Sequence, residues 1–282
     1  ELMQRLVTKS LVCLFIVSLL LNMSVSAQDR NNTATSSESI ADAGVYLMGL
    51  RLEPEPNQKE KGSIWSSNKI RIINLGPIVN WKGNDYAPTV SADGKTLYFV
   101  SNRPGGKLNE KGKMSEDFWA IKKTDRMDSV FQAPFNIDPN SEGMLGVNTP
   151  LNEGAASLAA DRQTLYFTAC DRPDGLGGCD IYKTIIEGDK WGRPINLGRN
   201  VNSDAFDTQP SISPDQSRLY FASVRKGPHS NGKPDLDNAD IWYCDWDQDL
   251  EEWKPAKNLE AINTDGTEVS PFIGADGITL FF

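Results

Sequence analysis

NSDAFDTQPSISPDQSRLYF, residues 202–221, is one of four related copies within a chain of 282 residues. The other copies begin at Asn80, Asn148 and Asn263, and all four fit one ungapped pattern, N-x4-[DE]-x7-D-x3-L-[YF]-F. The acids at the sixth position are Asp85, Glu153, Asp207 and Glu268. The aspartates at the fourteenth position are Asp93, Asp161, Asp215 and Asp276. A repeat of this kind predicts an array of similar structural units.

Each copy predicts a β-hairpin. A short strand of mixed polarity precedes the fourteenth-position aspartate, and an aromatic and β-branched strand, such as residues 96–101, follows it. We interpret the four aspartates as structural turn residues, because Asp accepts hydrogen bonds from nearby backbone N–H groups. Gly94 follows the first of them and tolerates a positive φ. Arg162 and Gln216 stand at that position in the next two copies, which predicts a strained turn or another turn type.

Two further strands follow three of the copies. The third strand begins with Asp, an apolar residue and an aromatic one, and the fourth carries an aromatic residue five positions before an Asn. The starting residues and the asparagines are Asp117 and Asn136, Asp180 and Asn196, and Asp240 and Asn258. Four antiparallel strands per unit predict an all-β protein, a β-propeller of four-stranded antiparallel blades. The blades span about residues 84–138, 153–198 and 207–260, a fourth begins at Glu268, and we expect further strands after Phe282.

The turn and strand motif resembles that of a known family. Ser-Pro-Asp-x-x-x-Leu-Tyr-Phe at residues 213–221, followed by Arg225 and later by Asp-Ile-Trp, is similar to the WD40-like repeat of TolB-like propellers. The resemblance covers roughly residues 70–282 and implies an exported bacterial propeller, in some proteins joined to an OmpA-like domain. It also implies alternatives, because similar propellers form the gating domain of prolyl-oligopeptidase-type serine peptidases and occur in glycan-active enzymes.

The N-terminal region predicts export. Arg5 and Lys9 precede an apolar run at residues 11–21, and small residues lead to Ala27, so we expect a signal peptide over residues 1–27. Its removal takes away one acid and two bases and changes the formal net charge from −9 to −10. Residues 28–66 are polar and predict a flexible exported segment, and residues 67–282 form the propeller. Residues 70–76 resemble a fourth strand, so we expect the chain to enter the propeller on an outer strand.

Cys170 and Cys179 flank an eight-residue loop between two predicted antiparallel strands. Their spacing predicts a disulfide in an oxidising compartment. Cys13 lies in the signal peptide, and Cys244 is left unpaired within a strand.

The four sixth-position acids have two interpretations. Each would begin an innermost strand, so Asp85, Glu153, Asp207 and Glu268 could ring one mouth of the central channel and hold a cation or a basic peptide. Alternatively, Arg103, Arg172 and Arg225 end the second strands opposite these acids, which predicts a repeated structural ion pair. We favour the structural interpretation.

Other sites are not indicated. His229 is the only histidine, which leaves little basis for a Ser-His-Asp triad or a multi-histidine metal site. The acidic run at residues 245–251 lacks the glycine and the final glutamate of an EF-hand loop. We therefore predict no catalytic, metal or cofactor residues in this segment. An acidic surface also disfavours nucleic acid, so we expect a non-catalytic module that binds protein partners in the periplasm or at the outer membrane.

Overall fold

The computed structural model describes residues 46–47, 50–54, 68–72, 74–123, 131–228 and 238–282. The predicted signal peptide, His229 and most of the segment 28–66 lie outside these residues. Every named element in the described part is a β-strand, in agreement with the predicted all-β fold.

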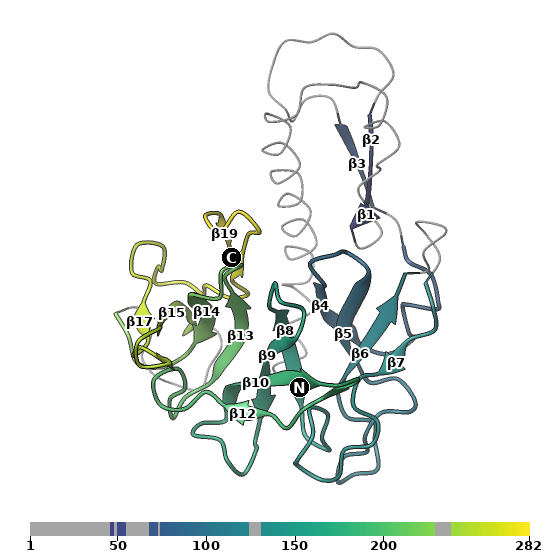
Figure 1. Ribbon diagram of the computed structural model, residues 1–282, viewed down its shortest axis with the longest axis horizontal. Coiled ribbons are helices and arrows are strands. Elements are labelled where there is room, and N and C mark those ends of the chain that lie inside the picture. Colours follow the sequence, from purple (N-terminus) through teal and green to yellow (C-terminus); the bar gives the residue numbers. More distant parts are fainter. Residues whose placement is uncertain (1–45, 48–49, 55–67, 73, 124–130, 229–237) are drawn as a thin grey trace.

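Three consecutive antiparallel sheets form blades one to three and lie side by side (Figure 1). Blade one contains β4 (Asp85–Val90), β5 (Thr96–Ser101), β6 (Asp117–Lys122) and β7 (Phe135–Asn136). Blade two contains β8 (Glu153–Leu158), β9 (Thr164–Cys170), β10 (Cys179–Glu187), β11 (Lys190–Trp191) and β12 (Ile195–Asn196). Blade three contains β13 (Asp207–Ile212), β14 (Arg218–Ser223), β15 (Asp240–Asp247), β16 (Glu252–Trp253) and β17 (Lys257–Asn258). Blade four begins with the pair β18 (Phe272–Ile273) and β19 (Leu280–Phe281). This arrangement confirms the predicted blades.

The fourth strand of blades two and three is interrupted rather than continuous. In blade two β11 and β12 both pair with β10, and in blade three β16 and β17 both pair with β15. Pro194 and Pro255 lie in the interruptions. Because proline has no N–H to donate to the ladder, the outer strand divides at this point.

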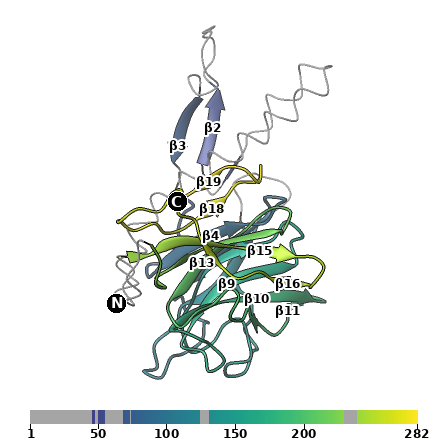
Figure 2. The ribbon, with the colours of Figure 1, turned by 90° about the vertical axis from the view of Figure 1, so that its left-hand side faces the viewer.

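The N-terminal strands form a separate sheet. β1 (Tyr46–Leu47), β2 (Leu50–Pro54) and β3 (Asn68–Ile72) pair antiparallel in that order and stand apart from the blades in both views (Figures 1 and 2). The expected outer strand at residues 70–76 is therefore wrong for β3, which pairs with β2. The sequence resemblance to a fourth strand does hold for the turn that follows β3. There Asn74 and Gly76 make the same hydrogen bonds as Asn196 and Gly198.

Apolar side chains fill the two spaces between neighbouring blades. Between blades one and two, Phe118 packs edge-to-face on Phe167, which stacks on Tyr182. Between blades two and three, Tyr166 packs on Trp253. The aromatic side chains of β9 thus face both neighbours, and all seven residues of β9 are buried. Blade-to-blade contact is the main source of apolar burial in this fold.

A buried asparagine at the first position of the repeat joins consecutive blades. Asn202 Oδ1 accepts a hydrogen bond from Ile181 N at 2.8 Å, and its Nδ2 donates to Ile181 O at 2.9 Å and to Asn196 Oδ1 at 2.9 Å. Asn196 Nδ2 in turn donates to Asp180 Oδ2 at 2.7 Å. We call this set the asparagine clamp. It recurs with Asn148, Asn136 and Asp117, and with Asn263, Asn258 and Asp240.

The four hairpin turns share one conformation. Gly94, Arg162, Gln216 and Gly277 all have φ between 59° and 68°. The expectation of strain at Arg162 and Gln216 is confirmed, and the alternative of another turn type is wrong. Arg162 Nη1 donates to Asp93 Oδ2 of the preceding blade at 2.8 Å, so a non-glycine residue here gains an inter-blade contact.

The predicted disulfide is present. Cys170 and Cys179 face each other in the register of β9 and β10, and their sulfurs are bonded. Cys244 is a buried free thiol. The disulfide closes the loop between the second and third strands of blade two and thereby lowers the conformational entropy of that loop in the unfolded chain.

The asparagine clamp predicts a large, position-dependent loss of stability. Asn202→Ala leaves the buried N–H of Ile181 without a partner and removes the bond to Asn196 Oδ1, while Ile181 O keeps its bond from Leu197 N; the free energy of unfolding should therefore fall by about 2–3 kcal/mol. The matched control is Asn80→Ala: Asn80 is exposed and bonds Asn74, and the change should cost under about 1 kcal/mol. Urea denaturation measures both, and equal losses would show that the clamp has no special role.

The turn aspartates predict a pH dependence. A hydrogen bond from the Ser213 hydroxyl, followed by bonds from Ser217, lowers the pKa of Asp215 from 3.8 to about 2. Because the folded state binds this proton more weakly, the stabilisation is present above pH 4 and is lost as the pH falls toward 2. Asp215→Asn should therefore be less stable than the parent at pH 6, with a difference that narrows toward pH 3. Asn202→Ala removes no titrating group and serves as control; a constant gap for Asp215→Asn would contradict the assignment.

Candidate functional site

The innermost strands of the blades carry a repeated β-bulge. In β4, β8 and β13 the register shifts at residues 86–89, 154–156 and 208–211. At the eighth position of each repeat a non-glycine residue has positive φ: Ala87 (47°), Ala155 (45°), Gln209 (56°) and Ser270 (57°). A positive φ is energetically unfavourable for a non-glycine residue. Its recurrence at the same position of four repeats indicates that this backbone conformation is required there.

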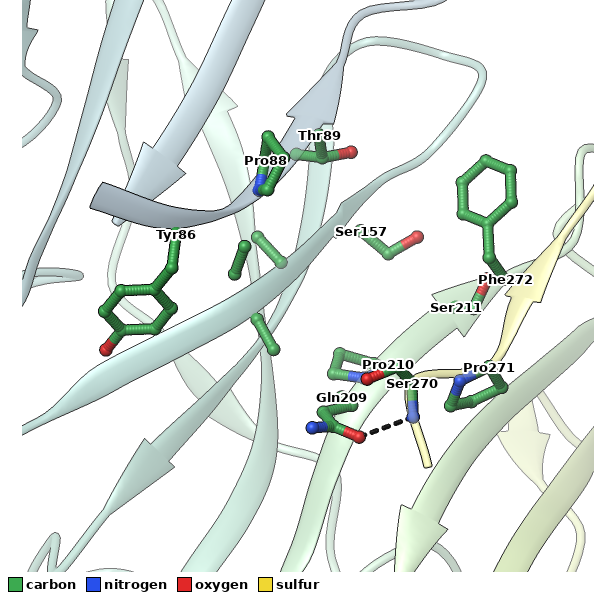
Figure 3. A pocket seen from close by; sticks show the side chains of 13 residues that line it. Tyr86, Pro88, Thr89, Ser157, Gln209, Pro210, Ser211, Ser270, Pro271 and Phe272 are labelled. Atoms are coloured by element: carbon green, nitrogen blue, oxygen red, sulfur yellow. Dashed lines mark hydrogen bonds between the residues drawn. The ribbon is translucent and has the colours of Figure 1, made fainter. Parts of the chain in front are cut away.

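The three bulges and the equivalent segment around Ser270 line one groove. Its walls are the bulge residues and their neighbours from four consecutive blades, and β8 lies between β4 and β13 (Figure 3). The cavity volume is about 90 Å³, which has room for a few ordered waters or one side chain. The lining contains no charged side chain, and Tyr86, Phe272 and three prolines make much of it apolar.

The sequence contains a signal for this groove that the hairpin interpretation missed. Pro88, Pro210 and Pro271 occupy the ninth position of three copies. Proline cannot donate to a central ladder and occurs at sheet edges and bulges. A proline within every first strand except that of blade two therefore points to a bulged edge strand.

Three lining residues depart from the repeat. Tyr86 stands where the other copies have Gly154, Thr208 and Val269. Gln209 stands where they have alanine or serine, and Phe272 stands where they have Thr89, Ser157 and Ser211. Packing of the repeated unit does not require these larger side chains, because the other blades form without them.

The predicted ring of acids does not line the groove. Asp85, Glu153 and Asp207 begin the innermost strands as expected, but their carboxylates bond inward. Asp85 Oδ1 lies 2.8 Å from Arg103 Nη2, Glu153 Oε1 lies 3.2 Å from Arg172 Nη2, and Asp207 Oδ1 lies 2.5 Å from Arg225 Nη2. These are the within-blade ion pairs that the structural interpretation predicts.

The second oxygen of each acid closes a short loop. It accepts the backbone N–H of the residue four positions earlier in all four copies, including Thr264 N to Glu268 Oε2 at 2.9 Å. The four side chains are therefore spent on folding contacts. The turn residues Asp93, Asp161, Asp215 and Asp276 each accept backbone N–H bonds at the hairpin ends, as their structural role predicts.

Blade two differs from its neighbours in this ion pair. Arg103 Nε and Arg225 Nε each donate to a serine Oγ at 2.9 Å, whereas buried Arg172 Nε has no partner among the described residues. The equivalent position is Ala169, opposite Glu153. Blade two thus has a glutamate opposite an alanine where blades one and three have an aspartate opposite a serine. The additional methylene of the glutamate takes the volume that the serine hydroxyl fills in the other blades. Burial is the main cause that raises the pKa of Glu153 to about 7, against the opposing effect of Arg172.

Tyr86 is the groove residue with the strongest polar contact. Its hydroxyl donates to Glu116 Oε2 at 2.5 Å, and Asn84 Nδ2 donates to Glu116 Oε1 at 3.3 Å. Burial, followed by the Glu116 charge, raises the pKa of Tyr86 well above its ordinary value. A phenol held neutral in this way is a wall and a hydrogen-bond donor rather than a nucleophile.

The described residues contain no group of three His, Cys, Asp or Glu side chains placed to hold a metal ion. Among the same residues no helix is long and apolar enough to cross a membrane.

Comparison with known proteins supports similarity of fold. No family model matches the sequence, and no curated protein matches it. Among solved structures, TolB from Acinetobacter baumannii shares 15% identity with a TM-score of 0.45, over 76% of this chain and 39% of that one. A structure described as that of TolB from Agrobacterium tumefaciens shares 13% identity with a TM-score of 0.44, over 81% of this chain and 66% of that one. The Trypanosoma rangeli sialidase shares 9% identity with a TM-score of 0.37, over 73% of this chain and 34% of that one.

This chain is similar to TolB β-propellers in its fold. It spans 39% of the length of the Acinetobacter baumannii protein and about two thirds of the Agrobacterium tumefaciens protein. Because one fold can support many different functions, the function must be argued from the groove.

The ion-pair difference in blade two predicts coupling between two positions. Glu153→Asp alone removes a buried methylene and lengthens the bond to Arg172, and Ala169→Ser alone adds an atom to a filled site; each should cost about 1–2 kcal/mol. The double variant reproduces the blade-three arrangement and should lie within about 0.5 kcal/mol of the parent. Denaturation of all four proteins gives the coupling energy. The reverse exchange in blade three, Asp207→Glu with Ser223→Ala, is the matched control, and additive costs would refute the exchange of volumes.

Proposed function

We propose that this chain is an exported, non-catalytic binding module, and that a protein partner inserts part of its surface into the groove of the innermost strands. The observation that supports it most is the groove itself. Four residues with positive φ, three of them in β-bulges, line one uncharged, largely apolar cavity that also contains side chains absent from the other copies of the repeat.

The dimensions of the groove favour a protein over a cofactor. A volume of about 90 Å³ accepts one side chain, whereas drug-sized ligands occupy several hundred Å³. A single buried anchor surrounded by loop contacts is a common arrangement at protein interfaces. The loops that vary in length between the blades would provide those surrounding contacts.

The cysteines and the predicted signal peptide support an exported location for the module. The Cys170–Cys179 disulfide suits an oxidising compartment. Together with the predicted signal peptide, it supports the periplasm or the outer-membrane surface as the site of action, with envelope proteins as partners. The formal net charge of −9 disfavours nucleic acid as a partner.

Two catalytic alternatives remain hypotheses. A peptidase-gating propeller would guard a hydrolase domain elsewhere in a longer protein, and a glycan-active propeller would need a carboxylate pair in the groove. The acids nearest the groove bond arginines within their own blades, and Tyr86 bonds Glu116. No described contact favours either alternative.

Site-specific crosslinking tests the proposal. A photoreactive phenylalanine analogue at Thr89, which lines the groove, should crosslink a distinct envelope protein in intact cells. The matched control places the same analogue at Ile195, an exposed residue of the outer strand β12. The proposal predicts a product that depends on position 89 and disappears when Phe272→Asp adds a charge to the groove. The same products at both positions, or none at position 89, would contradict it.

A further inference from the structure

Gln209 holds a polar group directed into the groove. Its Oε1 accepts a hydrogen bond from Ser270 N, in the next blade, at 2.6 Å (Figure 3). Because a backbone N–H can only donate, the oxygen of the amide must face Ser270. The Nε2 group therefore points away from that bond, and no described residue accepts from it. The amide is fixed in orientation and has two free donors.

Two serine hydroxyls of the groove are also held in place by accepting a backbone N–H from the next blade. Ser157 Oγ accepts from Ile212 N at 3.1 Å, and Ser211 Oγ accepts from Ile273 N at 3.0 Å. Each hydroxyl thus bridges to the innermost strand of the next blade. With an acceptor site used for the fold, each still has its O–H to donate. Three neighbouring side chains of the groove therefore offer donors to an incoming group.

The charge of the groove narrows the class of ligand. No lysine or arginine lines it to hold a carboxylate or phosphate, and no aspartate or glutamate lines it to accept from a cation. The chain also carries a formal charge of −9, which repels anions. Neutral acceptors are what remain, and in a protein partner these are the carbonyl groups of the backbone and of side-chain amides.

We propose that the groove binds an uncharged, extended peptide segment, one residue of which enters the cavity, and that Gln209 Nε2 is the selecting donor to its backbone carbonyl. Proline-containing segments fit best, because proline presents a carbonyl without an N–H that would need an acceptor. Tyr86 and Phe272 supply the apolar and aromatic walls on which such segments pack. This inference rests on the proposed binding function and names the chemistry of its ligand.

Nuclear magnetic resonance of the whole protein tests it with defined probes. N-acetyl-prolyl-proline methylamide should shift the side-chain amide resonances of Gln209 saturably, with a dissociation constant on the order of millimolar for so small a ligand. Methyl glucoside and acetate, at the same concentrations, should leave those resonances unchanged. The resonances are assigned by their loss in Gln209→Glu.

The variant Gln209→Glu keeps an oxygen for Ser270 N and replaces the donor with a carboxylate. Binding to this variant is followed by the backbone amide resonance of Ser270, which is present in both proteins. The variant should weaken binding of the proline probe at least tenfold while the melting temperature stays near that of the parent. Gln132→Glu makes the same chemical change at an exposed position and should bind as the parent does. Equal binding by Gln209→Glu, or a saturable shift with the glucoside or acetate in place of the peptide, would overturn the proposal.

The two proposals fail separately. Crosslinking at Thr89 with no response to the proline probe would leave a protein-binding groove but overturn the assigned ligand chemistry. A response to the proline probe that Gln132→Glu keeps and Gln209→Glu loses supports the chemistry without reference to any partner from the cell.

Discussion

The asparagine clamp is the contact on which the blade array depends. One side chain, such as Asn202, satisfies both the N–H and the C=O of a third-strand residue and also holds the asparagine of the fourth strand. The fourth strand consists of two short pieces, so it has few ladder bonds of its own. Buried backbone groups must be paired, so the link between blades has to deliver this asparagine to the same place each time.

The clamp explains why the repeat has a fixed length while the loops do not. From the asparagine to the sixth-position acid the chain must pass from the outer edge of one blade to the innermost strand of the next. The acid closes this passage by accepting an N–H four residues back and bonding the arginine at the end of the second strand. Loops that lie outside this circuit, such as residues 104–115, carry no such requirement and differ in length between blades.

Hairpin turns, acids, arginines and cysteines were predictable from the sequence because each acts locally. Aspartate at a turn, and cysteines opposite one another in neighbouring strands, have few alternative geometries. The asparagine clamp was not predicted in its bonds, since Asn148 and Phe118 meet only after a blade has folded. The division of the fourth strand into two pieces coincides with Pro194 and Pro255. It was not predicted, because the effect of a proline depends on which edge of the sheet it occupies.

The groove was the least predictable feature. The positive φ of Ala87, Ala155, Gln209 and Ser270 has no signature in residue type, because none of them is glycine. Only the prolines that follow indicate a bulged strand. The free donor of Gln209 depends on a bond to Ser270, sixty-one positions away in the sequence. Residues that depart from a repeat are a useful guide here, because the other copies show what the fold requires.

The clamp also has a consequence for how such a chain can be lengthened. Each blade is completed by an asparagine that belongs to the segment after it: Asn148 completes blade one, and Asn202 completes blade two. A block cut at the edges of the sheets would therefore lack its final asparagine, whereas a block cut after the asparagine would contain its complete clamp. The module that gene duplication can copy intact is therefore offset from the visible blade.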